Sequence, residues 1–476
     1  MSVKKLIVVL TLLLSISGIS SAQKLQTLVH QPPDGAGIGF LLTDGTAVFQ
    51  GAGCSDWWKL TPDISGSYVK GTWKQVASLP SGYSPLYFAS AVLADGRLVI
   101  EGGEYSECGG QFTLTNQGAI YDPKADKWAM LTPPKGWKYT GEPPSVVLPD
   151  GRYLLANKLD KRLAALDPKT LKWTAMKSTG KSDFNAEEGW TLLADGSILT
   201  FDVKNAPHSE RYLPSQQKWT SAGSTIVDLH SPHIGGCIPY PGGCYHAPGE
   251  VGPGILLPNG KVLATGSGSN GGSGPGHTAI YDTATGKWSV GPDFPNGDNA
   301  GDSFAALLPS GRALILGASG TLYEFDGKNL IPGPFAPGSL LVLPTGEIIV
   351  GGSAVYTSKG KASASWAPKI TKSPTSVTRG STYKISGKQF NGLSQANSFG
   401  DEDETATNYP LVRITNQSTH HVFYAKTHDH STMAVATGNA IVSTNFDVPA
   451  GMETGASTLV VVANGIPSKA VNINVN

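Results

Sequence analysis

Short apolar runs recur in pairs along the first three quarters of the chain, and a four-residue turn that ends in glycine joins each pair. The seven turns occupy residues 42–45, 93–96, 148–151, 193–196, 257–260, 308–311 and 343–346. Two apolar runs joined by such a turn predict a pair of antiparallel strands. The turn glycines follow one another at intervals of 51, 55, 45, 64, 51 and 35 residues. Intervals near 50 residues indicate one repeated supersecondary unit.

Each repeat is predicted to contain four strands. In the second repeat we expect them over residues 89–93, 97–101, 118–122 and 126–131. The outermost of these carries Trp128, and the other repeats carry an equivalent tryptophan at Trp73, Trp173, Trp219 and Trp288. A large flat side chain at this position can pack between neighbouring repeats. Together these features predict a seven-bladed kelch-type β-propeller over residues 23–366.

The last repeat lacks an outer strand of its own. Residues 26–33 resemble the outer strand at residues 129–134, so we expect residues 24–31 to complete the last blade and close the ring. After Trp366 the strand alternation continues without the glycine turn. Short strands over about 110 residues predict an immunoglobulin-like (early-set) β-sandwich over residues 367–476.

The first 22 residues have the pattern of a secretory signal peptide. Lys4 and Lys5 precede an apolar run at residues 6–19, and small residues at 20–22 offer a cleavage site. We therefore predict a secreted or periplasmic protein. No later segment is long and apolar enough to span a membrane.

Composition narrows the classes of partner. The chain is 39% hydrophobic and 15% charged, and its 36 basic and 36 acidic residues cancel. This is the composition of a globular protein without the basic surface that nucleic acid requires. We expect a monomer whose partner is a polar small molecule or a glycan.

The four cysteines are predicted to form two disulfides, because the chain is expected to be exported. Of the three possible pairings, the position within the repeats favours Cys54–Cys108 and Cys237–Cys244. Cys54 and Cys108 each follow the second strand of adjacent blades, and equivalent loops of adjacent blades are neighbours. A zinc site is the alternative for Cys237 and Cys244, because histidines lie nearby in the sequence.

Acidic residues are predicted to gather at one end of the propeller axis. Since the glycine turns lie on one face, the innermost strands begin on the other face, eight to ten residues earlier. The residues at those positions are Tyr87, Glu142, Glu187, Glu188, Glu250 and Asp302. Carboxylates that meet in this way need cations, basic groups or hydrogen-bond donors. Three interpretations stay open: they cap strand ends, they bind sugar hydroxyls or another polar ligand, or they bind a metal.

The C-terminal region contains a second group of candidate ligands. His420, His421, His428 and His430 fall within eleven residues. On an extended strand His428 and His430 would point to one face, a spacing that suits copper, zinc or nickel. The alternative is a polar hairpin in which these side chains bond locally. Residues 401–404 are all acidic and could bind calcium or form a solvated loop. Asn416 begins a glycosylation sequon whose use depends on the host.

The domain order and four segments, at residues 57–63, 187–193, 407–413 and 427–431, resemble secreted kelch-repeat proteins of galactose oxidase and glyoxal oxidase architecture. The resemblance implies the same fold over nearly all of the mature chain. The oxidases of this group hold one copper with two tyrosines and two histidines, and a cysteine is cross-linked to one of the tyrosines.

The matching positions in this chain carry other residues. The cysteine position is Ala89, the cross-linked tyrosine position is Glu142, and the tyrosine–histidine pair is replaced by Glu250 and Val251. Only the histidine from the C-terminal domain has a counterpart, at His420 or His421. We therefore expect the copper radical site to be absent.

These observations favour an exported binding protein that recognises a polar or carbohydrate ligand at the acidic end of the axis. The alternative is an enzyme, either a metal-dependent oxidoreductase or a carboxylate-based sugar-active enzyme. A protein-interaction scaffold is the third possibility.

Overall fold

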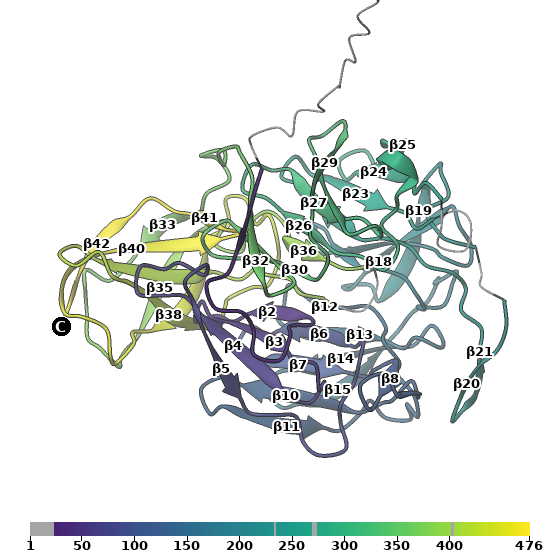
Figure 1. The fold of residues 1–476 in the computed structure, drawn as a ribbon, viewed down its shortest axis with the longest axis horizontal. Helices are drawn as coiled ribbons and strands as arrows, with labels where there is room; N and C mark the ends of the chain where they lie inside the picture. Colours follow the sequence, from purple (N-terminus) through teal and green to yellow (C-terminus); the bar gives the residue numbers. More distant parts are fainter. Residues whose placement is uncertain (1–22, 233–234, 269–273, 401–403) are drawn as a thin grey trace, which may run out of the picture.

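The computed structural model describes residues 23–232, 235–268, 274–400 and 404–476. These residues form an all-β molecule whose one short helical element is the 3₁₀ turn Pro295–Gly297. Seven four-stranded blades stand around a common axis, and a curled C-terminal sheet lies against one end of the ring (Figure 1). The predicted signal peptide and most of the acidic run at 401–404 lie outside the described residues. No helix within the described ranges is long and apolar enough to cross a membrane.

Within each blade the strands are antiparallel. In blades 1 to 6 the first strand along the chain is the innermost one. Blades 1 and 2 contain β2 (Gly39–Leu41), β3 (Ala47–Gln50), β4 (Trp57–Thr61) and β5 (Thr72–Val76), then β6 (Ala89–Val92), β7 (Leu98–Glu101), β10 (Gly118–Asp122) and β11 (Lys127–Leu131). Blades 3 and 4 contain β12 (Ser145–Val147), β13 (Tyr153–Ala156), β14 (Leu163–Asp167) and β15 (Lys172–Met176), then β16 (Thr191–Leu192), β17 (Ile198–Phe201), β18 (His208–Leu213) and β19 (Lys218–Ser224). Blades 5 and 6 contain β22 (Gly254–Leu256), β23 (Lys261–Thr265), β24 (Thr278–Asp282) and β25 (Lys287–Val290), then β26 (Ala305–Leu307), β27 (Ala313–Leu316), β28 (Thr321–Phe325) and β29 (Leu330–Phe335).

The seventh blade closes the ring with both ends of the propeller sequence. It consists of β30 (Leu340–Val342), β31 (Ile348–Val350), β32 (Ala354–Thr357) and, on the outside, β1 (Lys24–Thr27). β1 pairs antiparallel with β32 in the register Lys24↔Thr357. The predicted closure is confirmed, although the strand itself ends at Thr27 rather than at residue 31.

The glycine turns have the conformation that their sequence demands. The seven turn glycines, Gly45, Gly96, Gly151, Gly196, Gly260, Gly311 and Gly346, have φ between 75° and 89°. This left-handed region is open to glycine at little cost. In every turn the glycine N–H donates to the carbonyl of the leucine three residues earlier, at 2.8–3.0 Å.

Four of the five predicted outer tryptophans, Trp73, Trp128, Trp173 and Trp288, bond to a neighbouring blade. Trp128 of blade 2 donates its indole N–H to the carbonyl of Ala77, which follows the outer strand of blade 1, at 3.0 Å. Trp173 donates to Thr132 of blade 2 at 2.9 Å, and Trp73 donates to His30, beyond β1, at 3.1 Å. A repeated contact of this kind sets the angle between one blade and the next.

The C-terminal region forms one curled sheet with its own hydrophobic core, which includes Val412, Ile414, Phe446 and Leu459. Its strands are β33 (Lys369–Lys372), β34 (Ser376–Val377), β35 (Thr382–Lys388), β37 (Leu411–Asn416), β38 (Val422–His428), β39 (Val442–Asp447), β40 (Gly455–Ala463), β41 (Ile466–Pro467) and β42 (Val471–Val475). Curling brings the two ends of the sheet over the shared core, as in the predicted sandwich.

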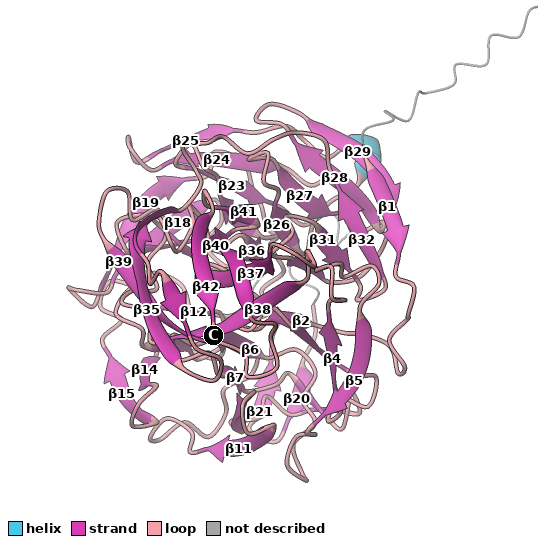
Figure 2. Cartoon of the chain, turned by 90° about the vertical axis from the view of Figure 1, so that its left-hand side faces the viewer, coloured by secondary structure: helices cyan, strands magenta, loops and turns pink. Residues whose placement is uncertain are grey.

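This domain covers the end of the ring that carries the glycine turns (Figure 2). The N–H of Thr427 donates to the Thr43 carbonyl at 3.0 Å, and the N–H of Met433 donates to the Pro149 carbonyl at 3.1 Å. The opposite end of the axis, where the innermost strands begin, is called the mouth below.

A segment of the C-terminal domain enters the axis itself. β36 (Asn397–Ser398) pairs with β26, the innermost strand of blade 6. The Asn397 side chain also accepts from the Val342 N–H at 2.9 Å and donates to the Leu340 carbonyl at 2.5 Å, which ties it to blade 7. The Oε1 of Gln395 accepts from the Leu192 N–H of blade 4 at 2.7 Å. We call residues 395–400 the axial segment; it fills the centre of the ring and holds three blades.

Candidate functional site

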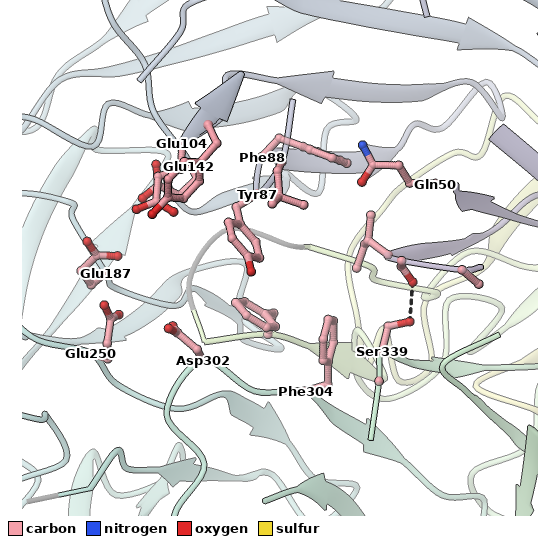
Figure 3. A pocket seen from close by; sticks show the side chains of 17 residues that line it. Gln50, Tyr87, Phe88, Glu104, Glu142, Glu187, Glu250, Asp302, Phe304 and Ser339 are labelled. Atoms are coloured by element: carbon pink, nitrogen blue, oxygen red, sulfur yellow. Dashed lines mark hydrogen bonds between the residues drawn. The ribbon is translucent and has the colours of Figure 1, made fainter. Parts of the chain in front are cut away.

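A cavity of about 650 Å³ opens at the mouth (Figure 3). Its lining includes five carboxylates: Glu104, Glu142, Glu187, Glu250 and Asp302. It also includes five aromatic side chains: Tyr87, Phe88, Tyr105, Phe304 and Phe399. We call this the axial cavity. Figure 3 shows the carboxylates together on one side, with Tyr87 next to them, and Gln50, Phe304 and Ser339 farther away.

Five of the six predicted mouth residues line the axial cavity: Tyr87, Glu142, Glu187, Glu250 and Asp302. They come from separate blades and meet because each stands just before an innermost strand. Tyr87, Glu187 and Asp302 also share a left-handed backbone, with φ of 55°, 57° and 45°. This conformation costs an L-residue on the order of 1 kcal/mol, and such residues cluster at ligand sites.

Lys158 is a buried counter-ion behind the carboxylates. Its Nζ contacts the Glu142 carboxylate and lies 2.6 Å from Glu187 Oε1, and its side chain is fully buried. Tyr245 donates its hydroxyl to the same Glu187 oxygen. Glu142 and Glu187 therefore share one buried cation.

Two other carboxylates have raised pKa values. Burial, together with the negative charges of Glu187 and Asp302, raises the pKa of Glu104 to about 7, although Lys158 opposes the shift. Asp302 reaches solvent at the open mouth but is surrounded by protein on its other sides. Its partial loss of hydration and the charge of Glu187 raise the pKa of Asp302 to about 6, against the opposing effects of Lys158 and of a hydrogen bond with Glu250.

Sequence reasoning missed Gln50, Glu104 and Lys158. Each lies at the end of the second strand of its blade or a few residues beyond it: Gln50 ends β3, Glu104 follows β7, and Lys158 follows β13. The second strand runs back from the glycine turn to the mouth, so its end faces the same cavity as the start of the innermost strand. The same repeat register could have identified these positions.

Glu188 does not reach the axial cavity, contrary to the prediction. Lys181 Nζ lies 2.9 and 2.8 Å from its two carboxylate oxygens and 2.7 Å from Glu210 Oε2, in a separate buried cluster. Burial opposes protonation of Lys181, but Glu188 and Glu210 hold its pKa above the usual value. Neighbouring residues project to opposite sides here, so Glu187 faces the cavity and Glu188 faces the interior of blade 4.

The four predicted metal-ligand histidines are not brought together at the mouth. His421 pairs with Glu453 at 2.6 Å, and His420 stands beside it in the turn after β37. His428 ends β38 and contacts Asp429 and Asp447, at 2.7 and 3.2 Å.

His430 is separated from His428 by Asp429, whose φ of 51° breaks the strand. His430 is consequently buried against Tyr409 and does not share a face with His428. Burial lowers the pKa of His430 to about 3. In the C-terminal domain, Phe399 rather than a histidine reaches the cavity.

The donor set at the mouth does not fit a copper radical centre. Glu142 and Glu250 line the cavity where the resembled oxidases place tyrosines, and Ala89 opens β6 where they place the cysteine. Within the described ranges, no group of three His, Cys, Asp or Glu side chains is arranged to hold a metal ion.

Two disulfide-linked hairpins lie near the axial cavity, and the first of them contributes Tyr105 to its lining. The Cys54–Cys108 bond ties the hairpin of β8 (Tyr105–Ser106) and β9 (Gln111–Phe112) to blade 1. The Cys237–Cys244 bond closes the hairpin of β20 (Ile238–Tyr240) and β21 (Gly243–Tyr245). Phe112 and Tyr245 stack between the hairpins with ring centroids 5.9 Å apart. Both predicted pairings are confirmed.

No protein-family model matches the sequence, and no curated protein is significantly similar to it. Several solved structures have a similar fold. A fungal alcohol oxidase of the AA5 family in complex with copper is 12% identical, with 95% of this chain and 98% of that chain covered and a TM-score of 0.48. A catalytically inactive virginiamycin B lyase from Staphylococcus aureus with quinupristin is 11% identical, with coverages of 70% and 98% and a TM-score of 0.47. The extracellular domain of a proposed one-component system from B. thetaiotaomicron is 10% identical, with coverages of 95% and 58% and a TM-score of 0.47. Likeness at this level concerns the fold and carries no conclusion about activity.

Proposed function

We propose that this chain is an exported binding protein that takes a carbohydrate, or a polar small molecule of similar size, into the axial cavity. One observation carries the proposal: carboxylates and aromatic rings from several blades line a single cavity of about 650 Å³. That volume is typical of small-molecule sites. Carboxylate oxygens accept hydrogen bonds from hydroxyl groups, and ring faces pack against the apolar face of a sugar.

The two disulfides support export, because such bonds persist in oxidising compartments. The Cys54–Cys108 bond also supports a preformed site, since it ties the hairpin that carries Tyr105 to blade 1. A preformed cavity lowers the ordering cost of binding.

A carboxylate-based sugar-active enzyme is the second candidate, and Glu104 is the observation that favours it. With a pKa raised to about 7, Glu104 holds its proton near neutral pH and could donate it to a leaving oxygen. Glu187 and Glu142 lie beside the Lys158 ammonium group in the same cavity. The cavity thus places a carboxyl group that keeps its proton near neutral pH close to further carboxyl groups, and acid–base catalysis on sugars uses two such groups.

A glycan array followed by calorimetry tests the proposed function. Glu250→Gln keeps the side-chain shape and removes the charge, so we expect ligand affinity to fall about tenfold or more. Glu347→Gln, directly after the glycine turn of blade 7, is the matched control and should bind normally. Product analysis after incubation with the bound glycan separates a binding protein from the sugar-active enzyme.

Unchanged affinity of Glu250→Gln, together with an altered melting temperature, would show that the carboxylates only cap strands. Absence of binding to every glycan and polar metabolite tested would reject the proposed function.

A further inference from the structure

The charge on the wall of the axial cavity is unbalanced. Five of its lining side chains are carboxylates, and no Lys, Arg or His belongs to the lining within the described residues. Lys158, the cation behind the wall, is fully buried and engages Glu142 and Glu187. The surface that a ligand meets is therefore negative.

We propose that the ligand of the axial cavity carries a positively charged nitrogen, as an amino sugar or another polyhydroxylated amine does. This inference rests on the proposed function and specifies the charge of its ligand. The ammonium group would face the carboxylates of Glu104, Glu250 and Asp302, and the carbon skeleton would lie on the aromatic rings.

One carboxylate oxygen in the cavity wall, Oε2 of Glu142, is buried without a hydrogen-bond donor among the described residues. Glu142 is 2% exposed, and its Oε1 contacts Lys158. Its Oε2 accepts no hydrogen bond from the described residues, although Glu142 lines the cavity. A buried acceptor left without a donor is costly, so a donor from a ligand at this place would be stabilising.

The aromatic side chains distinguish an organic cation from a bare metal ion. Tyr87 is 40% exposed, and its ring lies 6.2 Å from that of Tyr105 at an interplanar angle of 66°. Phe304 and Phe399 form a second pair, 4.6 Å apart and tilted by 60°. Rings beside carboxylates attract an ammonium group through cation–π contacts and also pack against hydrocarbon. A hydrated metal ion would use the carboxylates but gain nothing from the rings.

Binding of a cation should change the protonation of two carboxyl groups in the cavity, Glu104 and Asp302, and this change can be measured. Glu104 faces Lys158, Glu187 and Asp302, and Asp302 faces Glu187, Lys158 and Glu250. Burial and like charges hold the pKa of Glu104 at about 7 and that of Asp302 at about 6. A positive ligand would lower both pKa values, so binding near pH 6.5 would release protons. A neutral ligand would release none by this route.

Titration calorimetry of the mature chain with two matched probes tests the inference. The probes are chitotriose, which carries three free amines, and its fully N-acetylated form, which has the same skeleton and no charge. We expect chitotriose to bind at least tenfold more tightly at pH 6.5 and to release protons, measured in buffers of different ionisation enthalpy. Its affinity should rise between pH 5 and pH 6, because Asp302 and part of Glu104 lose their protons there while the sugar amines stay largely protonated.

Asp302→Asn should remove most of this preference and reduce proton release, whereas Glu347→Gln should leave both unchanged. Equal affinity for the two probes, or tighter binding of the acetylated one, would overturn the inference while leaving carbohydrate binding intact. Failure of both probes, together with binding of a neutral glycan on the array, would also overturn it. Calcium competition that abolishes chitotriose binding at millimolar concentration would instead assign the carboxylates to a metal.

Discussion

At the scale of single residues, the charge of the cavity wall depends on one buried lysine, Lys158, which lies among several carboxyl groups. Lys158 engages Glu142 and Glu187. Glu104 and Asp302 belong to the same wall and hold their protons to a pH above the usual range of a carboxyl group. One buried cation thus pairs directly with two of the five carboxyl groups and opposes the pKa rise of two others.

Replacing Lys158 with methionine should lower the free energy of unfolding by about 3–5 kcal/mol, because two buried carboxylates lose their counter-charge. Urea denaturation of the purified variant measures this loss. Lys135→Met, at an exposed loop position, is the control and should change stability by less than about 0.5 kcal/mol. Adding Glu142→Gln to Lys158→Met should recover part of the loss; a further loss would contradict the ion-pair interpretation.

His430 should make the protein less stable in mild acid. Its pKa is about 3 in the folded chain and about 6.5 when unfolded, because burial disfavours the charged ring. The unfolded state therefore binds more protons between these values, and stability falls as the pH drops below about 6.5. From pH 7 to pH 5 this one group should remove about 2 kcal/mol.

The measurement compares free energies of unfolding at pH 7 and pH 5 for the wild type and for His430→Phe, which keeps a ring against Tyr409. The other titrating groups are common to both proteins, so the difference isolates His430. An identical pH dependence in the two proteins would show that His430 does not titrate in this way.

At the scale of secondary-structure elements, two blades are completed by strands that lie far from them in the sequence. β1 precedes blade 1 in the sequence and completes blade 7, while β36 comes from the C-terminal domain and extends blade 6. Each covers a strand edge that would otherwise remain unpaired. The side chain of Leu25 on β1 also packs against the core shared by blades 5, 6 and 7.

A chain that begins at residue 32 should be less stable by about 3–4 kcal/mol, because it loses the β1–β32 hydrogen bonds and opens the ring. Urea denaturation and size-exclusion chromatography would report lower stability and self-association through the free edge. A synthetic peptide of residues 23–31 should restore stability in trans, whereas Lys24→Ala in the full chain should have little effect. Normal stability of the shortened chain would contradict the role of closure.

At the scale of the whole molecule, the axial segment couples the C-terminal domain to the ligand cavity. The C-terminal domain lies against the turn end of the ring, yet its Phe399 lines the cavity at the mouth. Asn397, two residues earlier, is fixed by blade 7 and by pairing with β26. The position of Phe399 thus depends on contacts inside the ring.

Asn397→Leu should destabilise the protein by about 2–4 kcal/mol, because the Leu340 carbonyl and the Val342 N–H lose buried partners. It should also weaken ligand binding by displacing Phe399, although Asn397 itself does not line the cavity. Thermal denaturation and calorimetry measure the two effects, and Asn472→Leu on the exposed side of β42 is the control. Unchanged ligand affinity in Asn397→Leu would show that the axial segment does not position Phe399.

Features that depend on local pattern and repeat register were accessible from the sequence. Seven glycine turns gave the number of blades, the outer tryptophans gave the blade contacts, and the missing outer strand predicted closure by β1. The same register paired Cys54 with Cys108 and brought five of the six predicted residues to one cavity. These succeed because every blade repeats the same backbone path, so equal positions in the repeat become neighbours in space.

Only the tertiary structure decided which side chains face the cavity and what compensates their charge. Glu187 and Glu188 are adjacent in sequence, yet one faces the mouth and the other binds Lys181 inside blade 4. Lys158 pairs with Glu142 and Glu187 from behind the cavity wall, and Phe399 reaches the cavity from another domain. The direction in which each side chain points and the entry of Phe399 depend on loop conformations and on contacts between residues far apart in the chain, and the repeat pattern of the sequence does not encode either.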